Sequence, residues 1–156
     1  MDVDGTLTDG KIYMSATGEL FKAFDIKDGY GIYALLRKNN IEPVIITGRS
    51  SEIVKYRCAE LKIELVYQGI SDKLAKMNEI LVEQSLKDGT EYTLAECAYV
   101  GDDLPDLEIM EAINNAGGLS ACPADAVNEV LNVSTYKASK KGGEGAVREI
   151  IEYLIK

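Results

Sequence analysis

The segment Glu42-Pro-Val-Ile-Ile-Thr-Gly48 is the part of the chain that decides the fold. It is a short, β-branched apolar run closed by glycine, a pattern typical of a buried parallel strand. Strand-like and helix-like segments alternate from here to the end of the chain. The expected strands span residues 42–47, 64–67, 98–100 and 118–122, and the expected helices span residues 50–61, 71–84, 104–113, 124–131 and 144–155. This alternation predicts a parallel sheet with helices on both faces.

The segment before this strand predicts a small flap rather than a second domain. Residues 11–14 and 19–24 alternate around Ala16-Thr17-Gly18, which indicates a β-hairpin over about residues 11–25. Residues 31–39 have helical spacing and end in Asn-Asn. The chain has room for one helix and one strand between Thr47 and Lys73, and for no larger insertion. We therefore expect one α/β domain over residues 1–156, with a hairpin flap and no separate cap domain.

The composition argues against several classes of function. A chain of 156 residues with a net charge of −9 and no basic patch is unlike a nucleic-acid-binding protein. No apolar run is long enough to span a bilayer, so we expect no membrane partner. The chain has no histidine, which excludes imidazole catalysis. The three cysteines (Cys58, Cys97 and Cys122) form no CxxC pair and are typical of reduced thiols, which predicts a cytoplasmic protein.

Polar residues stand at the carboxyl ends of the expected strands. They are Thr47, Asp102 and Asp103, together with Asp2 and Asp4 in residues 1–6, which we expect to be the tail of a first strand running into a loop. Lys73 opens a helix whose N-terminus should face the same edge of the sheet. Because ligands of such sheets bind at the carboxyl ends of the strands, we expect these side chains to form one site. The alternative for the opening Asp-x-Asp-Gly-Thr is a surface turn, since Asp and Gly are common in turns.

Such a group of side chains suits phosphoryl transfer around a divalent cation. Asp2, Asp4 and Asp102 would supply hard oxygen ligands, carboxylate or backbone carbonyl, for Mg²⁺. The ion would offset the repulsion among the acids and attract a phosphate. Asp2 can then be the nucleophile that forms an aspartyl phosphate, and Asp4 the general acid and base.

The remaining polar residues of this edge have supporting roles in the same hypothesis. The Thr47 hydroxyl can donate to a phosphoryl oxygen, and Lys73 can hold both the phosphate and the nucleophile. Asp103 and Asp106 would orient the metal ligands from behind.

These stretches resemble the four motifs of the haloacid dehalogenase superfamily of aspartyl phosphatases. The motifs read DVDGT, TGR, a downstream lysine and GDDLPD. The likeness extends to FDIKDGYGI (24–32), IITGRSSEIVKYRCAELKI (45–63), YQGISDK (67–73) and KKGGEGAVRE (140–149). In these stretches the chain is similar to the 3-deoxy-D-manno-octulosonate-8-phosphate (KDO-8-phosphate) phosphatases and the N-acylneuraminate-9-phosphate phosphatases. The resemblance implies a Rossmann-like, Mg²⁺-dependent phosphatase acting on a sugar-acid phosphate, KDO 8-phosphate foremost, in lipopolysaccharide biosynthesis.

The resemblance also implies which residues contact the sugar acid and its phosphate. They are Asp25, Ile26, Lys27, Asp28, Gly29, Gly48, Arg49, Arg57 and Lys73. The planar guanidinium of an arginine suits this task because it binds a carboxylate with two parallel hydrogen bonds. An ordinary connecting loop and solvated surface arginines are the alternatives at these positions.

A capless site in a single subunit would be open to water, whereas charged substrates react better where water is excluded. We therefore expect a neighbouring subunit to supply the lid. The resemblance implies the same, since the family forms homotetramers in which hairpins and C-terminal segments approach a neighbour's site. Residues 142–145 (Gly-Gly-Glu-Gly) with Arg148 are the expected contact in trans.

Three alternative functions stay open at the level of sequence. Tyr33 stands where many lipopolysaccharide-pathway relatives carry an arginine, which favours N-acylneuraminate 9-phosphate or a related nonulosonate as substrate, whereas Arg49 favours KDO 8-phosphate. A signalling receiver domain also places acids, Mg²⁺, a threonine and a lysine around a phosphorylatable aspartate, although in a different order. A structural subunit without activity is the third alternative, because only Met1 precedes Asp2. We expect the first strand to lack its first half, through a misassigned start or a truncation.

Overall fold

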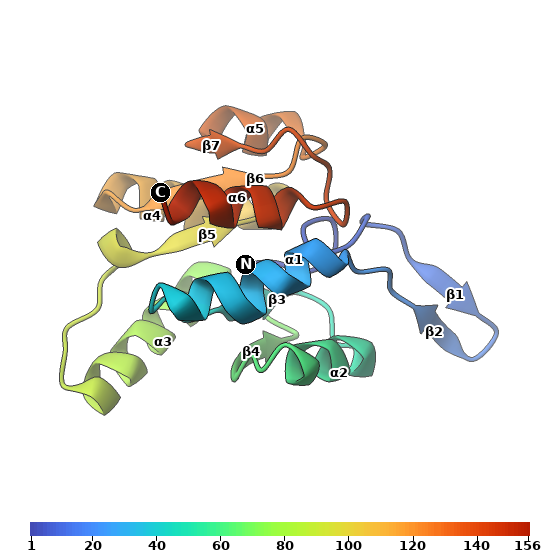
Figure 1. Cartoon of the computed structure of the whole chain (residues 1–156), viewed down its shortest axis with the longest axis horizontal. Coiled ribbons are helices and arrows are strands. Elements are labelled where there is room, and N and C mark those ends of the chain that lie inside the picture. Colours follow the sequence, from blue (N-terminus) through green and yellow to red (C-terminus); the bar gives the residue numbers. More distant parts are fainter.

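Parallel strands form the centre of the molecule in the computed structural model, which describes residues 1–156 (Figure 1). β3 (Val44–Thr47) pairs with β4 (Leu65–Gln68). β5 (Ala98–Val100) pairs with β6 (Leu119–Cys122), and β6 pairs with β7 (Tyr136–Lys137). All of these pairings are parallel, as the alternation of strands and helices predicts.

The first two residues join the two groups of strands. The backbone N–H of Ile46 donates to the carbonyl of Met1 (3.1 Å), and the N–H of Asp2 donates to the carbonyl of Val100 (2.9 Å). Figure 1 accordingly shows the N-terminus between β3 and β5. From Val3 onward the backbone turns, so the expected first strand consists of this bridge alone. A cavity of about 730 Å³ lies beside Met1, and both apolar and charged residues from the strands, η1, α3 and α6 line it.

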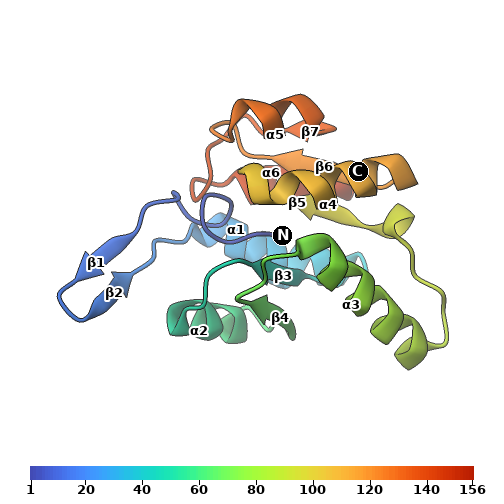
Figure 2. The ribbon, with the colours of Figure 1, turned by 180° about the vertical axis from the view of Figure 1, so that it is seen from behind.

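Helices cover both faces of the strands. On one face lie α1 (Ile26–Tyr30), η1 (Gly31–Leu36), α2 (Glu52–Glu60) and α6 (Ala146–Leu154). On the other lie α3 (Lys73–Asp88), α4 (Leu107–Ala116) and α5 (Asn128–Val133). Figures 1 and 2 show α6 and α1 in front of the strands in one view and α3 and α4 in front in the opposite view. The predicted α/β architecture is confirmed.

The two faces of the strands have separate cores because side chains alternate along a strand. Ile45 packs with η1, α2 and α6, whereas the next residue, Ile46, packs with α3 and α4. In the same way, Tyr99 packs on the side of α3 and α4, whereas Val100 packs on the side of α6. Strands with apolar residues on both faces read as continuous apolar runs, which explains the sequence of residues 44–46.

The predicted flap is the hairpin of β1 (Tyr13–Ser15) and β2 (Gly18–Phe21), which projects from the body of the protein (Figure 1). Its strands are antiparallel, and the rings of Tyr13 and Phe21 stack with centroids 4.3 Å apart. Only α2 and β4 lie between β3 and α3. The chain therefore has the capless arrangement expected from its spacing.

Local capping fixes where α3 begins, and this position matters for the site. The Asp72 carboxylate accepts a hydrogen bond from the N–H of Ala75 (2.8 Å), and Gly89 ends the helix with a left-handed φ of 67°. Lys73 is consequently the first residue of the helix, at the edge where the strands end. Two short 3₁₀ helices, η2 (Leu94–Glu96) and η3 (Leu104–Asp106), flank β5.

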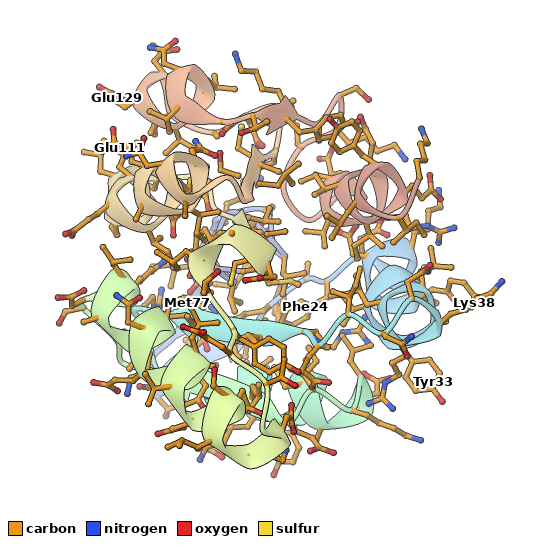
Figure 3. All side chains as sticks on the ribbon, turned by 90° about the vertical axis from the view of Figure 1, so that its left-hand side faces the viewer. Phe24, Tyr33, Lys38, Met77, Glu111 and Glu129 are labelled. Carbon is orange, nitrogen blue, oxygen red and sulfur yellow. The ribbon has the colours of Figure 1, made fainter.

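The helical segment after the hairpin starts earlier than the sequence predicts. Asp25 caps α1 by accepting from the N–H of Lys27 (2.6 Å), and the helix continues as the π-helix η1. Figure 3 shows Tyr33 and Lys38 projecting outward, whereas Met77 of α3 lies inside. Tyr33 packs under the cationic groups of Arg37 and Lys62, at 5.8 and 5.5 Å from the ring centre.

The two-faced core makes a stability prediction at Ile46. Ile46→Ala removes a fully buried side chain (0 % exposed) between the strands and α3, so we expect a loss of about 2–5 kcal/mol in the free energy of unfolding. Val82→Ala is the control, because Val82 is 61 % exposed on α3 and its truncation should change stability by roughly 0.5 kcal/mol or less. Urea unfolding followed by circular dichroism measures both, and equal losses would contradict the assignment of Ile46 to the core.

Candidate active site

A buried lysine joins two acids at the carboxyl edge of the strands. The Lys73 Nζ lies 2.6 Å from Asp106 Oδ1 and 3.1 Å from Asp2 Oδ1. All three side chains are buried. The contact with Asp106 is a hydrogen bond, whereas Asp2 Oδ1 has an ion pair without hydrogen-bond geometry. The N-terminal bridge, α3 and η3 thus meet at one point, as predicted from the strand ends.

Asp102 faces the same point from the loop after β5. Its Oδ1 accepts a hydrogen bond from the Thr6 hydroxyl (2.9 Å). Gly5 approaches Asp102 so closely that a Cβ on Gly5 would lie 1.9 Å from Oδ2. Position 5 requires glycine for two reasons: this close approach and its φ of +92°. The Gly-Thr pair of the opening sequence therefore shapes the loop around the Asp102 carboxylate.

Asp106 holds the group together from behind. Its Oδ1 accepts from Lys73 and from the Tyr99 hydroxyl (2.8 Å), and its Oδ2 accepts from the N–H groups of Asp102 (3.0 Å) and Asp103 (3.2 Å). With four donors, this carboxylate is fully engaged. The Asp103 side chain instead caps η3 through the N–H of Leu104 (2.8 Å) and is exposed. Of the two residues expected behind the metal ligands, Asp106 takes that position.

Burial and crowding change the pKa values of this group. Burial, followed by the charges of Asp2 and Asp106, raises the pKa of Asp102 to about 7. Burial also raises the pKa of Asp2, although the nearby Lys73 ammonium opposes this rise. For Lys73, burial acts to lower the pKa, but the carboxylates of Asp2 and Asp106 outweigh it and raise the pKa overall. Lys73 is therefore a permanent cation in this site.

The acids fit a hard divalent cation. Carboxylate oxygens of Asp2, Asp102 and Asp106 all lie within 4.8 Å of one another. Because Asp106 is occupied by its four donors, Asp2 and Asp102 are the residues with oxygens free for an ion. Asp2 Oδ1 is buried, and its one partner is the Lys73 ammonium at 3.1 Å without hydrogen-bond geometry, so the Asp2 carboxylate keeps lone pairs for an ion. An all-oxygen donor set of this kind suits Mg²⁺.

Asp4 and Thr47 stand beside this group. Thr47 ends β3 next to the N-terminal bridge and is buried. The Asp4 carboxylate lies outside the acidic cluster and is paired with the Lys22 ammonium. A contact between Asp4 and the metal therefore stays a prediction, and the backbone carbonyl oxygen of Asp4 would make it.

The loop of residues 25–29 makes contacts within the protein that a loop serving only to bind a substrate would not make. Asp25 caps α1, and Ile26 and Lys27 are exposed. Asp28 is buried, and its Oδ1 accepts from the backbone N–H of Arg148 at the start of α6 (2.7 Å). Burial raises the pKa of Asp28 to about 6. Asp28 thus ties α1 to α6, and a substrate contact of this loop stays a prediction.

Of the two arginines expected to bind a carboxylate, Arg49 lies just before α2 and Arg57 lies in its last turn. Arg49 follows β3 and is paired with Glu19 of the hairpin through Nη2 (3.2 Å), while its Nη1 is buried without a partner. Arg57 lies against the Cα of Gly29 and pairs with Glu60 (2.7 Å). Gly48 is exposed at the end of β3, beside Arg49. Each arginine thus retains donors without protein partners, at Arg49 Nη1 and Arg57 Nε.

The glycine-rich segment 142–145 lies against the opening loop of the same chain. A Cβ on Gly142 would lie 1.8 Å from the carbonyl oxygen of Gly5, and the N–H of Gly143 donates to the Thr6 carbonyl (3.3 Å). The Arg148 side chain pairs with Glu152 (2.7 Å) and covers the Tyr30 ring. The segment therefore braces the site in cis, and a contact of Arg148 in trans stays a prediction.

Sequence reasoning missed several residues of the site. Tyr99 and Lys22 contact Asp106 and Asp4 directly, and Glu19 joins Lys22 to Arg49. A signal existed for Tyr99, since a buried tyrosine in a core strand needs a partner for its hydroxyl. No local pattern distinguishes Lys22 from a solvated lysine.

No family model matches the chain. Individual relatives, however, match it over nearly all of its residues. The proteins named 3-deoxy-D-manno-octulosonate 8-phosphate phosphatase KdsC from Salmonella typhimurium and Escherichia coli K12 are each 43% identical over 155 residues, covering 99% of this chain and 77% of the relative. The Moraxella catarrhalis enzyme of this name, solved in complex with magnesium ion, phosphate ion and KDO, has a TM-score of 0.84 at 41% identity, covering 99% of this chain and 82% of that one.

A further solved structure extends the likeness to the superfamily. A Legionella pneumophila protein assigned to subfamily III A of the HAD superfamily has a TM-score of 0.85 at 34% identity and covers 97% of this chain and 77% of its own. The fold, with a lysine between acids at the carboxyl edge of the strands, is that of a haloacid dehalogenase-type hydrolase. The chain belongs to the 3-deoxy-D-manno-octulosonate 8-phosphate phosphatase family. This relationship excludes the receiver-domain alternative.

The raised pKa of Asp102 predicts a pH dependence of Mg²⁺ binding. Its folded-state pKa of about 7 lies above the ordinary value of 3.8, so between these values the folded protein holds a proton that a cation must displace. We expect a fixed Mg²⁺ concentration to raise the melting temperature more at pH 8 than at pH 6. Thermal unfolding with and without Mg²⁺ measures this rise, and equal rises at the two pH values would contradict the assignment.

Neighbouring aspartates provide a matched test of the metal site. Asp102→Asn removes an anionic ligand, so we expect Mg²⁺ affinity to fall by about tenfold or more. Asp103→Asn makes the same change one residue away, where asparagine can still cap η3, and should leave the affinity unchanged. Isothermal titration calorimetry with Mg²⁺ compares the variants. Equal losses of Mg²⁺ affinity in the two variants would show that the overall negative charge of this region attracts the ion, and that Asp102 is not a specific ligand.

Proposed function

We propose that the protein is a Mg²⁺-dependent phosphatase that hydrolyses 3-deoxy-D-manno-octulosonate 8-phosphate through an aspartyl phosphate. The observation that carries the proposal is the buried Lys73 between Asp2 and Asp106, with Asp102 beside it. Relatives at 43% identity bear this enzyme's name, and the M. catarrhalis structure holds Mg²⁺, phosphate and KDO. Lipopolysaccharide biosynthesis is the process in which this substrate belongs.

The chemistry assigned to the chain proceeds in two displacements. In the first, an Asp2 carboxylate oxygen attacks phosphorus, the bond from phosphorus to the ester oxygen breaks, and the Asp4 carboxyl group gives its proton to the departing alkoxide. In the second, Asp4 takes a proton from water as the water oxygen attacks phosphorus, and the bond from phosphorus to Asp2 breaks. Free phosphate leaves, and Asp2 and Asp4 return to their starting states.

The surrounding residues stabilise charge on the phosphoryl group. Asp2 and Asp102 would hold Mg²⁺, which would neutralise the phosphoryl oxygens and orient them toward the nucleophile. The Lys73 ammonium is already fixed by two carboxylates, so it needs no reorganisation to meet an anionic phosphate. The Thr47 hydroxyl at the end of β3 would donate to another phosphoryl oxygen.

The specificity residues are proposed to lie on the α2 side of the site. Arg49 and Arg57 retain buried guanidinium nitrogens without partners, which suit the carboxylate of a sugar acid. The loop of residues 25–29 beside Arg57 would complete this part of the site. Tyr33 lies on the outer surface under Arg37 and Lys62, away from this site in the same subunit. The tyrosine in place of the relatives' arginine therefore does not argue against KDO 8-phosphate as the substrate.

A homotetramer is part of the proposal. The hairpin presents exposed apolar side chains at Ile12, Met14, Leu20 and Phe21, which favour burial against another subunit. Analytical ultracentrifugation measures the oligomeric state directly. The three cysteines are free thiols, which supports the proposed cytoplasmic location. No helix is long and apolar enough to cross a membrane.

The function is tested by phosphate release from KDO 8-phosphate. Asp2→Asn removes the nucleophile, so we expect kcat to fall by at least about a thousandfold, and chelation of Mg²⁺ with EDTA should abolish turnover. Asp9→Asn is the matched control in the same loop, because Asp9 contacts only Lys11 and Tyr13. Preferential turnover of N-acylneuraminate 9-phosphate would transfer the assignment to that substrate, and activity retained in Asp2→Asn would overturn the mechanism.

A further inference from the structure

Lys22, the residue after β2, is a buried cation whose role the proposed reaction does not explain. Its side chain is 1% exposed, and its Nζ pairs with Asp4 Oδ1 and with Glu19 Oε1 (2.9 Å). An ammonium group is costly to bury unless it is paired and hydrogen-bonded. The two carboxylates therefore account for its burial, and one of them is the proposed general acid and base.

Glu19 connects Lys22 to the other side of the site. Its Oε1 also accepts from Arg49 Nη2 (3.2 Å), and its Oε2 accepts from the Ser51 hydroxyl (2.5 Å). Burial acts to raise the pKa of Glu19, but these donors and Lys22 outweigh it and lower the pKa overall. A charged network thus runs from Asp4 through the hairpin to the loop before α2.

Asp4 depends on Lys22 for its orientation. The carboxylate has no other hydrogen-bond or ion-pair partner in the structure, and Asp4 lies in the turn that follows the N-terminal bridge. Asp2 and Asp106, in contrast, are held by Lys73. Without Lys22, the Asp4 side chain would be free to rotate about its two side-chain bonds.

We propose that Lys22 is a positioning residue that holds the Asp4 carboxyl group toward the leaving oxygen of the phosphate ester. The inference rests on the proposed function, because it takes Asp4 as the group that protonates this oxygen. Glu19 anchors Lys22, so the hairpin forms part of the catalytic apparatus of its own subunit.

Leaving-group chemistry separates positioning of Asp4 from a merely structural role. An alkoxide needs a proton to depart, whereas p-nitrophenolate departs without one. We expect Lys22→Met to slow the first turnover of KDO 8-phosphate by roughly 10- to 100-fold and to leave that of p-nitrophenyl phosphate within about threefold. Rapid-quench measurement of the released alcohol and of p-nitrophenol reports the two rates.

Matched variants complete the experiment. Lys11→Met makes the same substitution at a lysine that is 72% exposed before the hairpin, and both rates should stay at the wild-type level. Lys22→Arg keeps the positive charge and should recover part of the alkyl-ester rate. Melting temperature and Mg²⁺ affinity are recorded for each variant. If Lys22→Met does not fold, the same rate ratio is read from Lys22→Arg and Glu19→Gln, which should slow the alkyl ester selectively and to a smaller degree.

The outcomes decide between clear alternatives. An equal loss with both substrates, or no loss with either, would overturn the positioning role. If the wild-type protein fails to hydrolyse KDO 8-phosphate but hydrolyses another alkyl phosphate, the proposed substrate is wrong. The comparison of alkyl and aryl esters then proceeds with that substrate and tests Lys22 independently.

Discussion

The contact of the Lys73 ammonium with the carboxylates of Asp2 and Asp106 is the constraint on which the rest of the site depends. Removal of the Lys73 charge would leave the two buried carboxylates without compensation, and breaking a buried ion pair in this way typically costs about 3–5 kcal/mol. The three residues come from the N-terminal bridge, the first turn of α3 and η3. Their mutual attraction therefore fixes three distant segments at one edge of the strands and holds the Asp2 carboxylate there.

The charge count at this edge explains why a divalent cation fits. Asp2, Asp102 and Asp106 together carry three negative charges when ionised, and Lys73 supplies one positive charge, so two negative charges are left over. In the absence of an ion, burial and, after it, this excess of negative charge raise the pKa of Asp102 to about 7. A divalent cation would balance the excess and allow Asp102 to stay ionised. The charge imbalance therefore contributes to the raised pKa of Asp102, after burial, and also accounts for the fit to Mg²⁺.

The sequence predicts this edge well because parallel topology determines it. Once the segment ending in Thr47 and the segment before Asp102 are taken as parallel strands, their carboxyl ends must meet. The environments of Asp28 and Lys22 could not be predicted in this way. Asp28 is held by a backbone N–H 120 residues further along the chain, at Arg148, so its role depends on how α1 packs against α6. Lys22 depends on the angle at which the hairpin leaves the body.

The hairpin, in a chain without a separate cap domain, has two properties: ion pairs hold its base in place, and its strands expose apolar side chains. A two-stranded hairpin alone is marginally stable in water, so its base must be held by other contacts. Here the buried Lys22 and the half-buried Glu19 bind the base to Asp4, Arg49 and Ser51 through ion pairs and a hydrogen bond. The exposed apolar side chains of Met14, Leu20 and Phe21 lie on the two strands, which project from the body (Figure 1). Charge therefore fixes the orientation of the flap within the subunit, and the strands of the flap carry its exposed apolar surface.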